Sequence, residues 1–106
     1  ESLGVQWIAT DESILYRSLE YTDKAQIYKP YRYNNMLIGF RDHVLSDKIG
    51  FEYRYKEANE AVEDFMSELQ KIEKNNRAAT VFVILDGENA WEFYLNNGYD
   101  FLEALY

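Results

Sequence analysis

The expected fold of the chain follows from Met36-Leu37-Ile38-Gly39-Phe40, an apolar run that ends abruptly at Arg41-Asp42-His43. Two other apolar runs, Val5–Ala9 and Thr80–Leu85, have the same layout and are each followed by a turn that carries acidic residues. Runs that are apolar almost throughout are typical of parallel strands covered on both faces. We therefore predict three parallel strands in an α/β fold, each strand ending in a polar turn.

Helical patterns lie between and after these runs. Across Glu57 to Lys74 apolar residues recur at spacings of three and four, which predicts an amphipathic helix between the second and third strands. Shorter helices are predicted over Ser13–Leu19 and from Asp100 as the N-cap to Tyr106, whereas Tyr21–Asn35 is predicted as a loop or short hairpin. The strand–helix alternation favours a parallel sheet or part of a barrel.

Composition narrows the range of partners. The chain has 106 residues and a formal net charge of −8, so it should repel nucleic acid. No apolar run is long enough to cross a bilayer and no segment has the layout of a signal peptide, so we expect a water-soluble protein of undetermined compartment. The ten tyrosines suit a core, an interface or a sugar-binding cleft alike.

Polar residues at the strand ends are the candidate functional groups, because the carboxyl ends of parallel strands meet at one edge. They are Asp11, the Arg41-Asp42-His43 triplet and Asp86-Gly87-Glu88. Carboxylates brought together in this way suit glycoside hydrolysis, which uses two carboxyl groups. Other roles remain open. Asp11 could cap the following helix, Arg41 and Asp42 could form a buried ion pair, and the only histidine, His43, could be structural.

Asp86 is the strongest candidate acid because it ends the most apolar run, and Gly87 lets the backbone pass close to a ligand. Glu88 is near enough for like-charge repulsion to raise a carboxyl pKa, and Trp91 and Tyr94 offer apolar surface for desolvation and for stacking on a sugar. With one histidine and no cysteine, neither a transition-metal site nor a cofactor is expected.

Three long segments carry a family resemblance. They are Trp7-Ile8-Ala9-Thr10-Asp11-Glu12-Ser13-Ile14-Leu15, Phe40-Arg41-Asp42-His43-Val44-Leu45-Ser46-Asp47-Lys48-Ile49-Gly50-Phe51 and Ile84-Leu85-Asp86-Gly87-Glu88-Asn89-Ala90-Trp91-Glu92-Phe93-Tyr94. In this order they resemble motifs of glycoside hydrolase family 57, especially its amylopullulanase-like and α-amylase-like branches. Together they span nearly the whole chain.

The resemblance implies a retaining enzyme that acts on α-glucans through a covalent glycosyl-enzyme intermediate. It also implies that residues 1–106 are an internal part, truncated at both ends, of a catalytic domain built as an incomplete (β/α)7 barrel. The acid/base role carries over to Asp86, whereas the family's nucleophile glutamate belongs to a motif before the Trp7 segment that has no match here. Leu95 stands where the family often has proline.

The predicted function is therefore that of an α-amylase, amylopullulanase or 4-α-glucanotransferase, with an α-glucan or maltooligosaccharide as substrate. The partner would be the remainder of the same catalytic domain. Two alternatives are a non-catalytic α-glucan-binding domain and a polysaccharide deacetylase, which would need more histidine ligands. The residues expected to support Asp86 are Arg41, Asp42, His43, Asp47, Glu88, Asn89 and Trp91.

Overall fold

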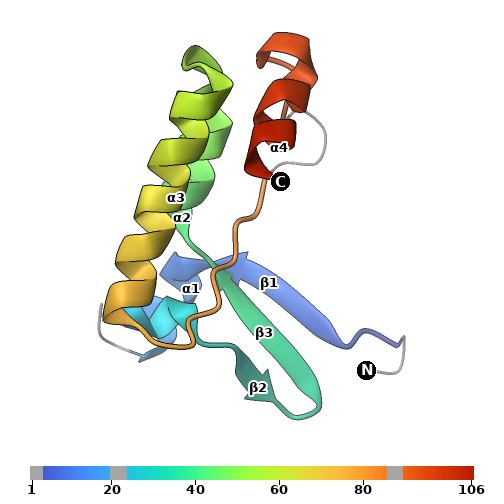
Figure 1. Cartoon of the computed structure of the whole chain (residues 1–106). Coiled ribbons are helices and arrows are strands. Elements are labelled where there is room, and N and C mark those ends of the chain that lie inside the picture. The colour runs from blue at the N-terminus through green and yellow to red at the C-terminus, as the bar shows by residue number, and fades with distance from the viewer. Residues whose placement is uncertain (1–3, 20–23, 86–89) are drawn as a thin grey trace.

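The computed structural model describes residues 4–19, 24–85 and 90–106. Within these residues the elements follow one another as β1 (Trp7–Asp11), α1 (Glu12–Leu19), η1 (Lys24–Tyr28), β2 (Tyr31–Tyr33), β3 (Met36–Arg41), α2 (His43–Asp47), η2 (Lys48–Glu52), η3 (Tyr53–Tyr55), α3 (Ala58–Asn75), η4 (Leu95–Gly98) and α4 (Tyr99–Leu105). Figure 1 shows α3 and α4 side by side above a small sheet. The predicted α/β class is confirmed at this level.

The sheet has the strand order β1-β3-β2. β1 and β3 pair in parallel with Asp11 opposite Arg41, so the first two predicted strands are confirmed, with bounds that differ by up to two residues. β2 pairs with β3 in antiparallel fashion around a turn at Asn34 and Asn35, which makes the sheet mixed. The hairpin falls in the segment predicted as a loop or short hairpin.

The third predicted strand, over Thr80–Leu85, is wrong as a strand. Its run lies beside the end of β3, where Phe82 forms an isolated parallel bridge with Arg41 and accepts a 2.9 Å hydrogen bond from the Asp42 N–H. The reason is geometric. β1 covers one edge of β3, β2 covers residues 36–38 of the other, and the chain turns into α2 at His43.

The predicted helices over 13–19, 57–74 and 100–106 are confirmed as α1, α3 and α4, to within two residues at each end. The cap of α4 differs from the prediction. Gly98, at φ 82°, is the N-cap, and Asp100 lies in the first turn, where it accepts a hydrogen bond from Asn96. The left-handed backbone at the cap is a conformation that favours glycine.

The segment from His43 to Tyr55 is one helical stretch that changes its winding. α2 passes into a π turn, η2, which closes with a hydrogen bond from the Tyr53 N–H to the Lys48 carbonyl, and then into the 3₁₀ helix η3. One extra residue is therefore accommodated between Lys48 and Tyr53. This winding directs Ile49 and Tyr53 into the core, while Phe51 between them is exposed.

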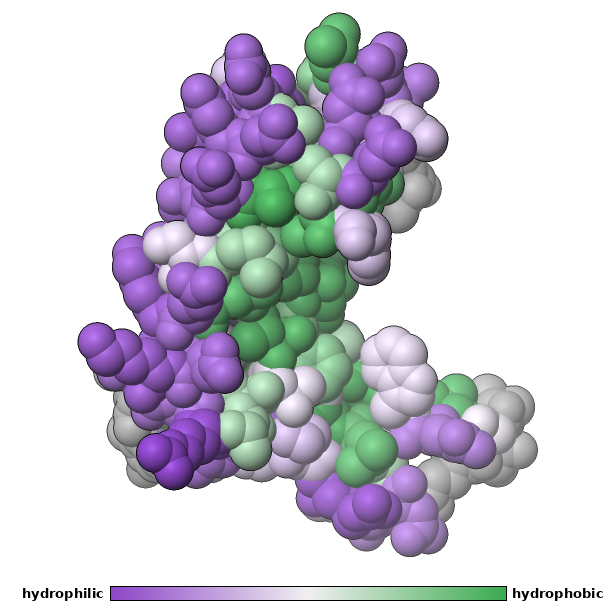
Figure 2. Space-filling model, in the orientation of Figure 1, coloured by the Kyte–Doolittle hydropathy of each residue, from purple (hydrophilic) through white to green (hydrophobic). Residues whose placement is uncertain are grey.

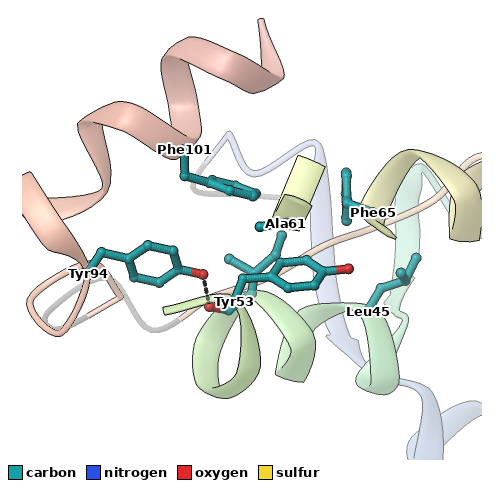
Figure 3. Close-up of a cluster of buried hydrophobic side chains, with 7 residues drawn as sticks. Leu45, Tyr53, Ala61, Phe65, Tyr94 and Phe101 are labelled. Atoms are coloured by element: carbon teal, nitrogen blue, oxygen red, sulfur yellow. Dashed lines mark hydrogen bonds between the residues drawn. The ribbon is translucent and has the colours of Figure 1, made fainter. Parts of the chain in front are cut away.

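The core consists of two clusters. In the larger one, α3 and α4 pack with the His43–Tyr55 stretch, and Figure 3 shows its rings and aliphatic side chains. Its buried members are Leu45, Ile49, Tyr53, Ala61, Phe65, Tyr94 and Phe101. The smaller cluster contains Leu15, Ile27, Tyr28 and Phe40. Ile72 and Val81 pack against both clusters and join them.

Apolar side chains also reach the surface. Figure 2 shows them gathered in the hollow between the α3–α4 arm and the sheet, where residues 80–85 run. Several of these side chains are only partly buried, among them Val81, Val83 and Leu85.

Candidate functional site

Four charged side chains meet where β1 and β3 end. Asp11 lies at the end of β1, Arg41 at the end of β3, and His43 and Asp47 on α2. Arg41 Nη2 lies 2.9 Å from Asp47 Oδ1, and Arg41 Nη1 lies 3.6 Å from Asp11 Oδ1. The His43 ring bridges the same carboxylates, with Nδ1 3.1 Å from Asp11 and Nε2 2.9 Å from Asp47. We call these four residues the strand-end cluster.

Local structure places the cluster. The parallel register sets Asp11 opposite Arg41, and α2 begins directly after Asp42, the N-cap whose carboxylate accepts the Leu45 N–H at 3.0 Å. His43 and Asp47 are four residues apart and therefore share one face of α2. Asp11 additionally accepts the Ser13 N–H at 3.2 Å, so its predicted capping role is confirmed alongside its place in the cluster.

The contacts within the cluster favour the charged forms of His43 and Asp11. The hydrogen bond to Asp11 raises the pKa of His43, and the Asp47 carboxylate adds to this effect. Burial acts to raise the pKa of Asp11, but hydrogen bonds from His43 and Ser13 outweigh it, and the pKa lies below its usual value. His43 thus keeps its proton to a higher pH than a free histidine, and as an imidazolium it donates to both carboxylates.

Asp42 belongs to a different environment. Its side chain is 2% exposed and accepts hydrogen bonds from the Tyr28 hydroxyl at 2.5 Å and from Lys24 Nζ at 3.3 Å. Burial and this hydrogen bond to Asp42 raise the pKa of Tyr28. The ion pair considered between Arg41 and Asp42 is wrong, because Arg41 pairs with Asp11 and Asp47 while Asp42 pairs with Lys24.

Asp42 lines a different cavity from Arg41 and Asp47. Asp42, Tyr28 and Lys24 line one of about 500 Å³. Arg41 and Asp47 line another of about 450 Å³. The remaining residues of the second cavity, which we call the strand-end cavity, are Ser46, Gly50, Phe51, Arg54, Ile84, Leu85, Ala90 and Phe93.

In the sequence, the segment predicted to carry the acid lies between two residues that line the strand-end cavity. Leu85 and Ala90, the residues on either side of 86–89, both line it. Asp86 itself, together with Glu88 and Asn89, lies outside the described residues. The roles of these three side chains therefore stay predictions.

Trp91 and Tyr94, expected to face a sugar, are packed in the core. The Trp91 ring lies 5.2 Å from the Tyr94 ring and 6.0 Å from the Phe101 ring. Tyr94 is buried and donates its hydroxyl hydrogen to the Ile49 carbonyl, and burial raises its pKa to about 12. Figure 3 shows this hydroxyl pointing toward the His43–Tyr55 stretch. These rings therefore belong to the larger hydrophobic cluster and do not line the strand-end cavity.

The aromatic rings at the strand-end cavity are instead Phe51, 62% exposed, and Phe93, 64% exposed. Arg54 joins them, with its guanidinium carbon 4.9 Å from the centre of the Phe93 ring. Sequence reasoning missed all three. Phe51 follows Asp47 by four residues, a spacing that would have placed it near Asp47 had residues 43–55 been predicted as helical.

No group of three histidine, cysteine, aspartate or glutamate side chains in residues 4–19, 24–85 and 90–106 is arranged to hold a metal ion. Over the same ranges, no helix is both long and apolar enough to cross a membrane.

Comparison with known proteins adds the family. No curated protein and no solved structure matches the chain significantly. The family model of Glycosyl hydrolase family 57, in contrast, matches residues 1–106. The cavity-lining residues Arg41, Asp47, Leu85 and Ala90, and Asp11, which contacts Arg41, lie within this match. The chain therefore belongs to glycosyl hydrolase family 57.

Proposed function

We propose that the chain carries the acid/base half of a retaining active site for α-glucans, of the α-amylase, amylopullulanase or 4-α-glucanotransferase type. Membership of the family supports a glycosidase with a carbohydrate substrate. In the proposal, residues 1–106 form an internal part of an incomplete (β/α)7 barrel, and the rest of that domain covers the apolar hollow of Figure 2. The proposal includes the branch of the family, the type of glycosidic bond that is cleaved and the barrel fold.

The observation that carries the proposal is the position of Leu85 and Ala90. Both line the cavity that Arg41 and Asp47 also line, beyond the carboxyl ends of β1 and β3. Active sites of barrels built from parallel strands lie at that end of the strands. Asp86 follows Leu85 directly in the sequence, which supports a carboxylic acid at this cavity.

Asp86 would act twice in the reaction. As an acid it would protonate the glycosidic oxygen while a glutamate outside this chain attacks the anomeric carbon. As a base it would then take a proton from water or from a sugar hydroxyl that breaks the glycosyl-enzyme bond. Glu88, by like-charge repulsion, would help Asp86 hold its proton, and Asn89 would contribute a hydrogen bond.

The strand-end cluster would hold the wall of the site in place. Arg41 and Asp47 contribute polar groups to the cavity, and the His43 bridge fixes Asp47 relative to β1 through Asp11. Asp42, which points into the other cavity, would act through the start of α2.

The test is Asp86→Asn in the full-length protein, assayed by release of reducing ends and by product analysis on maltooligosaccharides. We expect kcat to fall by about 10²–10⁴-fold, the usual contribution of an acid/base. An aryl glucoside with a good leaving group needs no proton in the first step, so that step should be largely retained. Glu103→Gln, an exposed carboxylate change on α4, is the matched control.

A near-wild-type kcat for Asp86→Asn on maltooligosaccharides would refute the assignment. If the unmodified protein instead binds maltooligosaccharides in a titration but turns none over, the non-catalytic α-glucan-binding domain is the correct function.

A further inference from the structure

Arg54 differs from the other arginine of the strand-end cavity. Arg41 has two carboxylate partners, Asp11 and Asp47. Arg54 has no ion pair with any carboxylate in the described part of the chain, and its guanidinium carbon instead lies 4.9 Å from the ring centres of both Tyr55 and Phe93. Such contacts hold a cation over aromatic faces without using its N–H donors.

The donors that Arg54 offers to a ligand are its terminal N–H groups. Its Nε, like that of Arg41, is buried and has no hydrogen-bond partner among the described residues, so a ligand in the cavity does not reach it. Arg54 lines the cavity, and no carboxylate of the described residues competes for its terminal nitrogens. These nitrogens are therefore the groups that a ligand in the cavity can bind.

The cavity has the size and surface for a pyranose ring. Its volume of about 450 Å³ is in the range of small-molecule sites, and it is lined by the exposed rings of Phe51 and Phe93. Aromatic rings pack against the C–H face of a sugar, while the sugar hydroxyls accept hydrogen bonds. Two adjacent hydroxyl oxygens match the two parallel N–H groups of a guanidinium in the way that a carboxylate does.

Charge alone does not choose between a neutral ligand and an anion. Asp11 and Asp47 offset the charge of Arg41, whereas Arg54 has no carboxylate partner among the described residues. The choice of a sugar rests on the family and on the exposed rings of Phe51 and Phe93. Inorganic phosphate is therefore the competing ligand that the experiment has to exclude.

We propose that Arg54 is a substrate-binding residue, which donates hydrogen bonds to two adjacent hydroxyls of a glucosyl unit lying against Phe51 and Phe93. The proposal rests on the proposed function, because it takes the ligand from the α-glucan class. It adds a binding subsite formed by η2, η3 and the residues after Ala90. The side chains of Phe51, Arg54 and Phe93 do not belong to the predicted acid/base machinery.

The experiment compares Arg54→Lys with Arg32→Lys in the full-length protein. Lysine keeps the positive charge and the contact with Phe93 but loses the fork of N–H donors. Arg32 is an exposed residue of β2, outside both cavities, and provides the matched control. Maltopentaose binding is measured by titration calorimetry in the Asp86→Asn background, where turnover does not interfere. KM, kcat and Tm are measured in the background that keeps Asp86.

We expect Arg54→Lys to weaken maltopentaose binding about tenfold and to raise KM similarly, with kcat and Tm little changed. Arg32→Lys should leave all four quantities unchanged. Phe93→Leu, which removes the ring but keeps an apolar side chain, should weaken binding in the same direction.

Three outcomes would overturn the proposal. They are equal maltopentaose affinity for the two lysine variants, a joint fall of Tm and kcat at unchanged affinity, and tighter Arg54-dependent binding of inorganic phosphate than of maltopentaose. Failure of the proposed function gives a different result. Asp86→Asn would then keep its kcat while Arg54→Lys still weakens maltopentaose binding, which supports the subsite.

Discussion

Replacing Asp42 with alanine should destabilise the protein by about 1.5–5 kcal/mol, a sum built from the contacts of this side chain. Loss of the N-cap of α2 costs about 0.5–2 kcal/mol. The Tyr28 hydroxyl, buried and bonded to Asp42 at 2.5 Å, would lose its acceptor at a cost of about 1–3 kcal/mol. Lys24 adds little, because it is half exposed and keeps Glu12 at 3.4 Å.

The assay is urea unfolding of the full-length protein, followed by tryptophan fluorescence, with KM and kcat measured in parallel. Asp42→Asn is the matched variant, and it should lose only about 1 kcal/mol because the amide oxygen can still accept from Leu45. Tyr28→Phe removes the hydroxyl that Asp42→Ala leaves unpaired. The double variant should therefore be more stable than the sum of the two single losses predicts.

The reasoning is refuted if Asp42→Ala changes the free energy of unfolding by less than about 0.5 kcal/mol, the range of ordinary surface substitutions. A rise in KM at unchanged stability would also refute it, and would return Asp42 to the substrate-binding role predicted from the sequence.

Two further predictions concern the sheet and the strand-end cluster. His43→Gln should remove a pH dependence. The folded-state pKa of His43 is raised and that of Asp11 lowered, so their interaction stabilises the protein above the acidic range and is lost as pH rises through the pKa of His43. Tm measured from about pH 5.5 to about pH 9 should fall more in the unmodified protein than in His43→Gln, and parallel profiles would contradict this. Gly39→Ala should lower stability by about 1–3 kcal/mol by overpacking, because its Cβ would overlap the ring of Phe82. Adding Phe82→Leu should recover part of the loss in thermal unfolding, and no recovery would show that the ring is not the obstacle.

The fold could be predicted where one segment carries its own pattern. β1, β3 and α3 have apolar runs or a helical period that local residues determine. Thr80–Leu85 has the same apolar character but forms a single bridge, because pairing depends on whether a neighbouring edge is free, and that edge belongs to residues far away in sequence. The His43–Tyr55 stretch was missed although Leu45, Ile49 and Tyr53 recur every four residues, since its change of winding breaks the regular period.

The sequence predicts which residues of the site lie together, but not how their side chains pair. The rule that functional residues follow strand ends brought Asp11, Arg41 and His43 together, and the structure confirms that they meet. It could not separate Arg41 from Asp42, because which way each side chain points depends on where β3 ends and α2 begins. Asp86 remains the central prediction and lies outside the described residues.

The π turn between Lys48 and Tyr53 makes the length of this segment as important as its composition. Deleting one residue there would restore ordinary α-helical winding and rotate everything that follows by about 100°. Tyr53 would leave its buried position beside Phe65 and Phe101, and Arg54 would leave the ring of Phe93. Gly50, in contrast, has no atom within 4 Å of an added Cβ. Insertions and deletions in this segment should therefore be tolerated far less than the substitution Gly50→Ala.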